Sequence, residues 1–460
     1  MRTLRGTARE AALATPADRD RVIDLIRAFS ILGVVGGHVM MAIVHWDADV
    51  PELGNLLASS VWLQLLTWVL QVMPLFFIAG GAASYLSWQS ASKKSMTYSE
   101  WLWRRMTRLL NPVFFYLSIM APIGGLASRI VSPSMATPLL NLTTQLLWFL
   151  GVYLLITALA PLLSSLHHSR GPWQILGWLA IVVGADLARL VWDGPAVIGL
   201  VNFIAVWAVA AVCGIWYLTM TVSRKLLAGV VLGGITINAL LVFYGPYPVS
   251  LVGMPGESFS NMAPPSLVMA VQTLVMWAAV ELLKPRLQSL GGRPRLWQGV
   301  VSVNLSAMTI YLWHLPILIV TTVCAHLLNV SPPVSRVSGL LVADSDFWTR
   351  ALPLWLITWV LVYALVRVLW STEHITWPFF KIKHEVSSAT WRTPVAIFGV
   401  IVTGIGMLLV SASGLSEFPT KVTEFAGLQW SSGVAVCWVV IGTIVVKTST
   451  VLGQRVNRTQ

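Results

Sequence analysis

Apolar stretches long enough to cross a lipid bilayer recur along the chain, from near residue 22 to near residue 446. A spanning helix needs about 20 predominantly apolar residues, because each residue adds about 1.5 Å along the helix axis. By this criterion the pattern predicts an all-α polytopic membrane protein with about twelve transmembrane helices. The predicted spans are residues 22–45, 59–88, 106–127, 142–163, 174–193, 198–220, 226–245, 264–283, 299–328, 351–371, 394–413 and 428–446.

Polar residues interrupt the first of these spans at positions that share one helical face. Arg27 and His38 are eleven residues apart, which places them within roughly 20° of each other and about 16 Å apart along a regular helix. Asp24 and His45 extend the same line at its two ends. Because lipid disfavours such side chains, the stripe should face the interior of the bundle or a wet cavity. It is a candidate functional site; the alternative is an interfacial anchor and a histidine bonded inside the bundle.

Charge is distributed unevenly between the loops on the two sides of the predicted membrane. With the N-terminus inside, 23 basic residues lie in the inner loops and the two termini, whereas four lie in the outer loops. This bias follows the positive-inside rule and predicts that both termini are cytoplasmic. The net charge of +12 is therefore a topology signal, and we expect no nucleic-acid partner. Residues 1–20 and 447–460 are expected to be cytoplasmic tails, the first of them disordered.

Composition and cysteine content narrow the chemistry. The chain is 56% hydrophobic and 10% charged, with a mean hydropathy of +0.76, which no soluble domain of this length shows. Its three cysteines, Cys213, Cys324 and Cys437, lie singly inside apolar spans, which argues against a disulfide framework or a zinc site. We therefore expect neither a bound metal nor a tightly bound cofactor.

Two further sets of polar residues are candidates for binding a substrate. Arg105 and Arg108, three residues apart at the start of the third span, can hold phosphate oxygens bidentately, or they can simply anchor the span at the interface. In the ninth span, Asn304 and Tyr311 lie on similar faces of one helix, with His314 within reach. That histidine can serve acid–base chemistry or bond a carbonyl group across the bundle.

Other features have mainly structural interpretations. Asp186 and Arg189 in the fifth span are expected to form an internal ion pair. In the second span, Pro74 and the pair Gly80-Gly81 predict either a bend that lines a cavity or a seam where a neighbouring backbone approaches closely. The outer loop 245–265, rich in Pro, Gly and Ser, is long enough to serve as a lid or an acceptor-binding loop.

Five motifs in the chain resemble those of the membrane acyltransferase 3 family. The first, RVIDLIRAFSILGVVGGH, matches a basic residue followed by ten residues and a histidine, here Arg27 and His38. The others are MPLFFIAGG, RRMTRLLNP with its Arg-x-x-Arg, LLWFLGVYLL and AMTIYLWHLP, and all occur in the family's order between residues 21 and 372. The details FFIAGG, SNMAPP and YLWH resemble the branch that is common in actinobacteria.

The resemblance implies a domain organisation. It implies an acyltransferase core of ten helices over residues 21–372. A linker and two additional helices follow over 373–446, and the family pattern does not explain them. No soluble esterase-like domain of the kind some members append is expected, because the tail 447–460 is too short for one. Transfer would then be completed by the membrane domain itself, or with a separate envelope-biosynthesis protein.

The resemblance also implies an activity. Family members move acyl groups, often acetyl, from cytoplasmic acyl-CoA to carbohydrates or glycolipids of the envelope. This chain would do so at the bacterial plasma membrane, with acyl-CoA, in the first place acetyl-CoA, as co-substrate. An envelope glycan or glycolipid would be the acceptor. The alternative class of function is a secondary transporter or lipid flippase with a polar intramembrane pathway.

Roles follow for the matched residues. Arg27 and His38 would be the catalytic pair, with His38 as general base or transient acyl carrier. The residues expected to contact substrate are Asp24, Arg105, Arg108, Asn304, Tyr311 and His314.

Overall fold

The structure, a computed structural model, describes residues 4–16, 19–48, 50–192, 194–254, 257, 259–373, 377–381, 391–425 and 427–451. Within these residues, twelve helical segments are long and apolar enough to cross a membrane, which confirms the predicted all-α polytopic fold. Residues 382–390 of the expected linker and 452–460 of the expected C-terminal tail lie outside the described part. The twelve spans are Val22–Met41, Val61–Lys93, Tyr98–Ile130, Pro133–Ala158, Ala160–Leu190, Val197–Thr219, Arg224–Phe243, Leu267–Gly291, Ala307–Leu327, Phe347–Trp370, Arg392–Ser413 and Ser432–Thr450.

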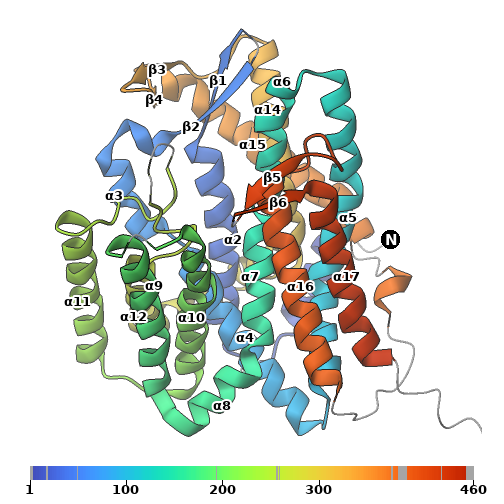
Figure 1. Cartoon of the computed structure of the whole chain (residues 1–460). Helices are drawn as coiled ribbons and strands as arrows, with labels where there is room; N and C mark the ends of the chain where they lie inside the picture. The colour runs from blue at the N-terminus through green and yellow to red at the C-terminus, as the bar shows by residue number, and fades with distance from the viewer. Residues whose placement is uncertain are drawn as a thin grey trace, which may run out of the picture. The chain divides into compact units, whose positions relative to one another are not determined.

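The chain divides into two compact units, and each is described by itself. The first unit comprises Met1–Ala48, Glu52–Ala83 and Leu162–Val368. Its elements, many of them labelled in Figure 1, are α1 (Leu4–Leu13), α2 (Val22–Met41), β1 (Ala42–Asp47), β2 (Val50–Asn55), η1 (Leu56–Ser59), α3 (Val61–Leu70), the first half of α4 (Met73–Lys93), α8 (Ala160–Arg170), η2 (Gly171–Trp173), α9 (Gln174–Leu190), η3 (Ala196–Val201), α10 (Asn202–Thr219), α11 (Arg224–Phe243), α12 (Leu267–Gly291), α13 (Pro294–Leu305), α14 (Ala307–Leu327), β3 (Val334–Val337), β4 (Leu340–Ala343) and most of α15 (Phe347–Glu373).

The second unit comprises Asp49–Pro51, Ser84–Pro161 and Leu369–Gln460. Its elements are the second half of α4, α5 (Tyr98–Ile130), α6 (Pro133–Thr144), α7 (Leu147–Ala158), η4 (Pro378–Phe380), α16 (Arg392–Ser413), β5 (Val422–Phe425), β6 (Leu428–Ser431) and α17 (Ser432–Val451). The strands of both units form two-stranded hairpins, β1 with β2, β3 with β4 and β5 with β6.

Glycines hold two helices of the first unit close together. At Gly81 of α4 an added Cβ atom would collide with the backbone of Ala211 on α10, and at Gly214 of α10 it would collide with the backbone of Ile78 on α4. Of the two interpretations of this glycine pair, the packing seam is therefore the one observed. The chain breaks earlier, between α3 and α4, and Pro74 lies in the first turn of α4, where proline is tolerated.

The expectation of a disordered N-terminal tail is wrong for residues 4–13. They form α1, which packs on α13 and buries Ala8 completely. The Trp297 indole N–H donates a hydrogen bond to the Thr15 hydroxyl (3.1 Å), and the Arg21 guanidinium lies 4.8 Å from the centre of the same ring. The segment is too polar to span a membrane, but its small apolar face is enough to cover α13.

The first predicted span is shorter than its apolar stretch. α2 ends at Met41, and the next residues form the strand β1. His45 therefore lies on a strand, and its expected place on the helical line of Arg27 and His38 is wrong. The run of β-branched and aromatic residues after Met41 explains the change, because such residues favour extended chain.

The ninth predicted span is broken. Ser306 separates α13 from α14, and its hydroxyl donates to the Ser302 carbonyl oxygen (2.6 Å). Serine side chains compete with helical hydrogen bonds in this way. Asn304 therefore lies on α13, whereas Tyr311 and His314 lie on α14, and the expectation of one shared helix is wrong.

The two helices beyond residue 373 form part of the core of the second unit. α16 and α17 lie side by side in Figure 1, and α16 also packs along α7. Glycines permit both contacts, since an added Cβ atom would lie 2.8 Å from Leu155 of α7 at Gly404 and 2.7 Å from the Val439 nitrogen of α17 at Gly406. At one end of the pair, Lys421 donates to the side-chain oxygen of Asn141 (2.9 Å), and burial lowers the pKa of this amine.

Candidate functional site

Two histidines from different helices meet in the first unit. Nδ1 of His38 on α2 lies 3.0 Å from Nε2 of His314 on α14. The ring planes are nearly parallel, at 12°, and the ring centroids are 5.3 Å apart. His314 is completely buried, whereas His38 keeps part of its surface exposed. The structure thus joins two of the residues that the sequence singles out.

The hydrogen bonds around His314 determine which ring nitrogens carry protons. Its Nδ1 lies 3.1 Å from the carbonyl oxygen of Ile310. A carbonyl oxygen only accepts, so this nitrogen holds the proton of the neutral ring. Nε2 of His314 is then an acceptor, and Nδ1 of His38 donates to it. A neutral His38 therefore carries its proton on Nδ1 and keeps the lone pair of its Nε2.

Arg27 and Asp24 do not pair with each other. Within the described residues, the guanidinium group of Arg27 has no hydrogen-bond or ion-pair partner, and its Nε is buried. Asp24 instead accepts from Arg19 Nε and Nη2, at 2.9 and 2.7 Å. Because α2 is continuous, Arg27 remains about 16 Å from His38 along the axis. Arg27 is therefore available to an anionic group, whereas Asp24 is neutralised by the chain itself.

The remaining candidates of the first unit lie in different places. The ring of Tyr311, which is almost fully buried, lies 6.2 Å from that of His314, so Tyr311 belongs to the surroundings of the histidine pair. The side-chain amide of Asn304 donates to the backbone carbonyl oxygen of Asp24 (2.9 Å). Asn304 thus ties α13 to the first turn of α2 and does not reach the pair through its own helix.

A basic cavity lies in the second unit. It has a volume of about 210 Å³ and is lined by four cationic side chains together with two serines: Lys94, Arg104, Arg105, Arg108, Ser87 and Ser90. Arg105 donates from Nη2 to the Ser84 hydroxyl (2.8 Å), and Arg104 pairs with Glu100 (2.6 Å). Arg108 is exposed. Four cations around one cavity suit a ligand with several phosphate groups.

The sequence indicated only part of this cavity. Arg105 and Arg108 were expected from their spacing, but Lys94 and Arg104 lie on the same cavity without belonging to that spacing. The available signal was charge density, since Lys93, Lys94 and Arg104 lie close together in the chain. Charge density alone does not distinguish a binding site from a topology anchor.

A second buried polar cluster in the first unit surrounds Asp186. The predicted ion pair with Arg189 is present, at 3.9 Å. Asp186 also accepts from the Asn202 side chain (2.8 Å), the Tyr247 hydroxyl (3.0 Å) and the Leu267 backbone N–H (2.7 Å). Burial first, and then the neighbouring carboxylate, raise the pKa of Tyr247, so this hydroxyl keeps the proton that it donates.

The first half of the loop 245–265 is hydrogen-bonded to neighbouring helices of the first unit. The side chains of Trp68 and Gln71 donate to the backbone oxygens of Val249 (2.8 Å) and Leu251 (2.9 Å). Together with the Tyr247–Asp186 contact, these bonds fix the first half of the loop to α3 and α9.

One comparison with known proteins identifies a family. The model of a family described as an acyltransferase domain, acyltransferase 3, matches residues 20–369. No curated protein and no solved structure gives a significant match to the chain. The matched range includes Arg27, His38, both arginines of the Arg-x-x-Arg motif and His314.

Proposed function

The chain belongs to the membrane acyltransferase 3 family, and on this premise we propose that it moves a short acyl group from acyl-CoA to a hydroxyl group. The donor is cytoplasmic acyl-CoA, acetyl-CoA in the first place. The acceptor is a carbohydrate or glycolipid of the envelope, and the site of action is the bacterial plasma membrane. The observation that carries this proposal is the contact between His38 and His314, because it leaves one imidazole nitrogen able to take a proton.

In the proposed mechanism His38 acts as general base. Its Nε2 takes the proton of the acceptor hydroxyl while the hydroxyl oxygen attacks the carbonyl carbon of the thioester. A carbon–oxygen bond forms, the carbon–sulfur bond breaks, and the departing CoA sulfur receives the proton from Nε2. His314 is the positioning residue, since it holds the resting proton of His38 on Nδ1.

A covalent variant uses the same nitrogen. Nε2 then attacks the thioester carbonyl itself, a carbon–nitrogen bond forms, the carbon–sulfur bond breaks, and CoA leaves as the thiolate. The acyl group stays on the imidazolium until the acceptor hydroxyl displaces it, and the proton of that hydroxyl neutralises the thiolate. The two variants differ in one observable. Only the covalent variant releases CoA and retains the acyl group on the protein when no acceptor is present.

The cationic side chains are proposed to bind the donor. CoA carries several phosphate groups, and guanidinium groups hold phosphate oxygens through paired hydrogen bonds. We assign this role to the basic cavity of the second unit, which includes Arg105 and Arg108. Arg27 is assigned an anionic or carbonyl oxygen of the donor, because its buried Nε has no partner within the described residues.

A deletion strain tests the proposed function. The strain is complemented with the wild-type gene or with the His38→Ala variant, and envelope lipids and glycans are compared by mass spectrometry. We expect one or more components to lose an acyl mass on deletion, to regain it with the wild type and not to regain it with the variant. Full restoration by His38→Ala, at equal protein level in the membrane, would contradict the proposal.

A further inference from the structure

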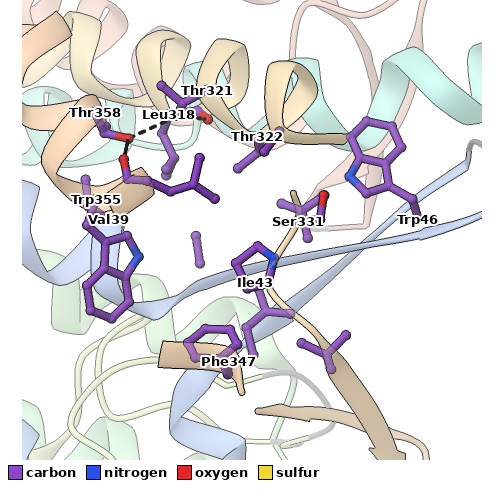
Figure 2. Close-up of a pocket in the computed structure, with 16 residues that line it drawn as sticks. Val39, Ile43, Trp46, Leu318, Thr321, Thr322, Ser331, Phe347, Trp355 and Thr358 are labelled. Carbon is purple, nitrogen blue, oxygen red and sulfur yellow. Dashed lines mark hydrogen bonds between the residues drawn. The ribbon is translucent and has the colours of Figure 1, made fainter. Parts of the chain in front are cut away.

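A small cavity lies next to the histidine pair in the first unit, on the side toward the C-terminal ends of α2 and α14. It has a volume of about 40 Å³ and lies between α2, β1, α14 and α15 (Figure 2). Ala42, four residues after His38, and Leu318, four residues after His314, both line it. Leu318 lies one helical turn, about 5.4 Å, beyond His314 on α14, and Ala42, the first residue of β1, closes the last turn of α2 by donating its backbone N–H to the His38 carbonyl oxygen. The cavity therefore begins about one turn beyond the pair on both elements.

The wall of the cavity that α14 provides is the same face that carries His314. Leu318, Thr321 and Ala325 line the cavity, and with His314 they follow the spacing of four, three and four residues that keeps side chains on one stripe. A group held at the imidazole can thus extend along this stripe without turning around the helix.

The cavity presents mostly hydrocarbon to an occupant. Phe347 and Trp355 form part of its wall (Figure 2). The hydroxyl groups of Thr321 and Thr358 already make hydrogen bonds within the protein. They lie 3.0 Å from each other, and they donate to the carbonyl oxygens of Leu318 (2.8 Å) and Leu354 (2.8 Å), respectively. Along this part of the wall an apolar occupant is favoured, since a polar one would lose its hydrogen bonds to water without replacing them there.

Four further polar side chains line the cavity: Thr322, whose hydroxyl donates to the Ile319 carbonyl oxygen (2.9 Å), Trp355, Trp46 and Ser331. The indole N–H of Trp46 and the hydroxyl of Ser331 belong to residues beyond the ends of α2 and α14. The buried Trp46 N–H, which has no hydrogen-bond partner within the described residues, therefore lies beyond the end of α2 and not on the turn next to His38. Its size also limits the occupant, because about 40 Å³ corresponds to roughly three water molecules, which is too little for a sugar ring.

We propose that this cavity takes the aliphatic end of the acyl group and sets the chain length that the protein accepts. The inference rests on the proposed function, in which the thioester carbonyl lies at His38. Acetyl is too short to cross one helical turn, so it leaves the cavity empty. An acyl chain of several carbons enters it and gains about fourfold in affinity for each methylene group buried.

Binding of acyl-CoA to the full-length protein in lipid nanodiscs tests this proposal without an acceptor. The probes are acetyl-, butyryl-, hexanoyl- and octanoyl-CoA, and the measurement is the dissociation constant of each. The wild type should bind one of the longer chains at least tenfold more tightly than acetyl-CoA. Ala42→Leu, which fills the entrance, should remove this gain and leave acetyl-CoA binding unchanged.

A second variant keeps the proposal testable if Ala42→Leu fails to fold. Leu318→Ala enlarges the cavity and should shift the preferred chain to a longer one. Leu356→Ala is the matched control, because Leu356 on α15 is 68% exposed and does not line the cavity. Equal binding of all four probes, with no change in either variant, would overturn the proposal and indicate a cavity that holds only water or part of the acceptor. Absence of binding by every probe would instead contradict the donor assignment itself.

Discussion

The first unit contains two buried polar clusters that differ in how their central side chains, the Asp186 carboxylate and the His38 imidazole, are hydrogen-bonded. Around Asp186, one carboxylate receives hydrogen bonds from Asn202, Tyr247 and Leu267 and the charge of Arg189. In the histidine pair, the bonds form a single line, from the Ile310 carbonyl through His314 to His38, and end with one unprotonated nitrogen.

The difference indicates which cluster holds the fold and which performs chemistry. A polar group buried in a membrane protein is costly unless it is satisfied, and both oxygens of the Asp186 carboxylate accept hydrogen bonds, so this carboxylate is explained by stability alone. Stability does not explain the histidine pair in this way, because its series of hydrogen bonds ends at an unprotonated nitrogen of His38. The sequence already predicts an internal ion pair for Asp186 and Arg189, and the hydrogen bonds that Asp186 accepts agree with that structural role.

Removal of the Asp186 carboxylate should have the largest effect on stability. Asp186→Ala leaves the mostly buried Arg189 guanidinium without its counter-charge and the completely buried Asn202 amide without its acceptor, and loss of one partner from a buried ion pair costs about 3–5 kcal/mol. We expect a markedly lower midpoint of thermal unfolding in nanodiscs. The turnover of the protein that stays folded should be close to wild type. A variant of unchanged stability with impaired turnover would reverse the roles that we give to the two clusters.

Replacement of His314 should impair mainly the turnover of the folded protein. His314→Ala leaves Nδ1 of His38 without its acceptor, so the proton of His38 is free to sit on Nε2. Loss of such an orienting partner typically costs about 10- to 100-fold, and we expect kcat of the folded protein to fall by this factor with little change in KM; because His314 is completely buried, the unfolding midpoint should fall as well. In a His38→Ala background the same substitution should add no further loss, because the two residues act as a unit. An additive loss would show that His314 acts independently.

Replacement of an exposed arginine of the basic cavity should have a smaller effect, on the binding of acetyl-CoA. Arg108→Gln removes one charge from the rim of the basic cavity, and we expect KM for acetyl-CoA to rise about tenfold, as for one hydrogen bond to a charged group. The effect should shrink at high salt, because exposed charges are screened. Arg129→Gln is the control, since Arg129 is an exposed arginine of the same helix that does not line the cavity. Equal changes in both variants would argue for a general charge effect.

Much of the fold could be predicted because hydropathy is a local property. Each span needs only its own apolar residues, and so the twelve spans follow from the sequence. The exceptions are local as well. A strand replaces the end of the first apolar stretch at His45, and a single serine, Ser306, divides the ninth. Hydropathy does not detect either change, because the residues on the two sides of each change are similarly apolar.

The candidate site could be predicted only in its parts. His38 and His314 were each singled out, but their contact joins positions 276 residues apart and depends on how α2 and α14 pack. The same holds for the pair that Asp24 forms with Arg19, which the sequence did not predict. A charged side chain pairs with a residue that lies close to it in three dimensions, and spacing along one helix does not predict that residue.

The most direct test of the central claim is the transfer of a labelled acetyl group by the purified protein in nanodiscs. The wild type is compared with His38→Gln, whose amide retains hydrogen-bonding capacity but cannot act as a base. We expect both proteins to bind acetyl-CoA equally, and the variant to transfer the label to envelope extract about 10²- to 10⁴-fold more slowly, which is the usual contribution of general acid–base catalysis. Transfer by His38→Gln at the wild-type rate would contradict the account.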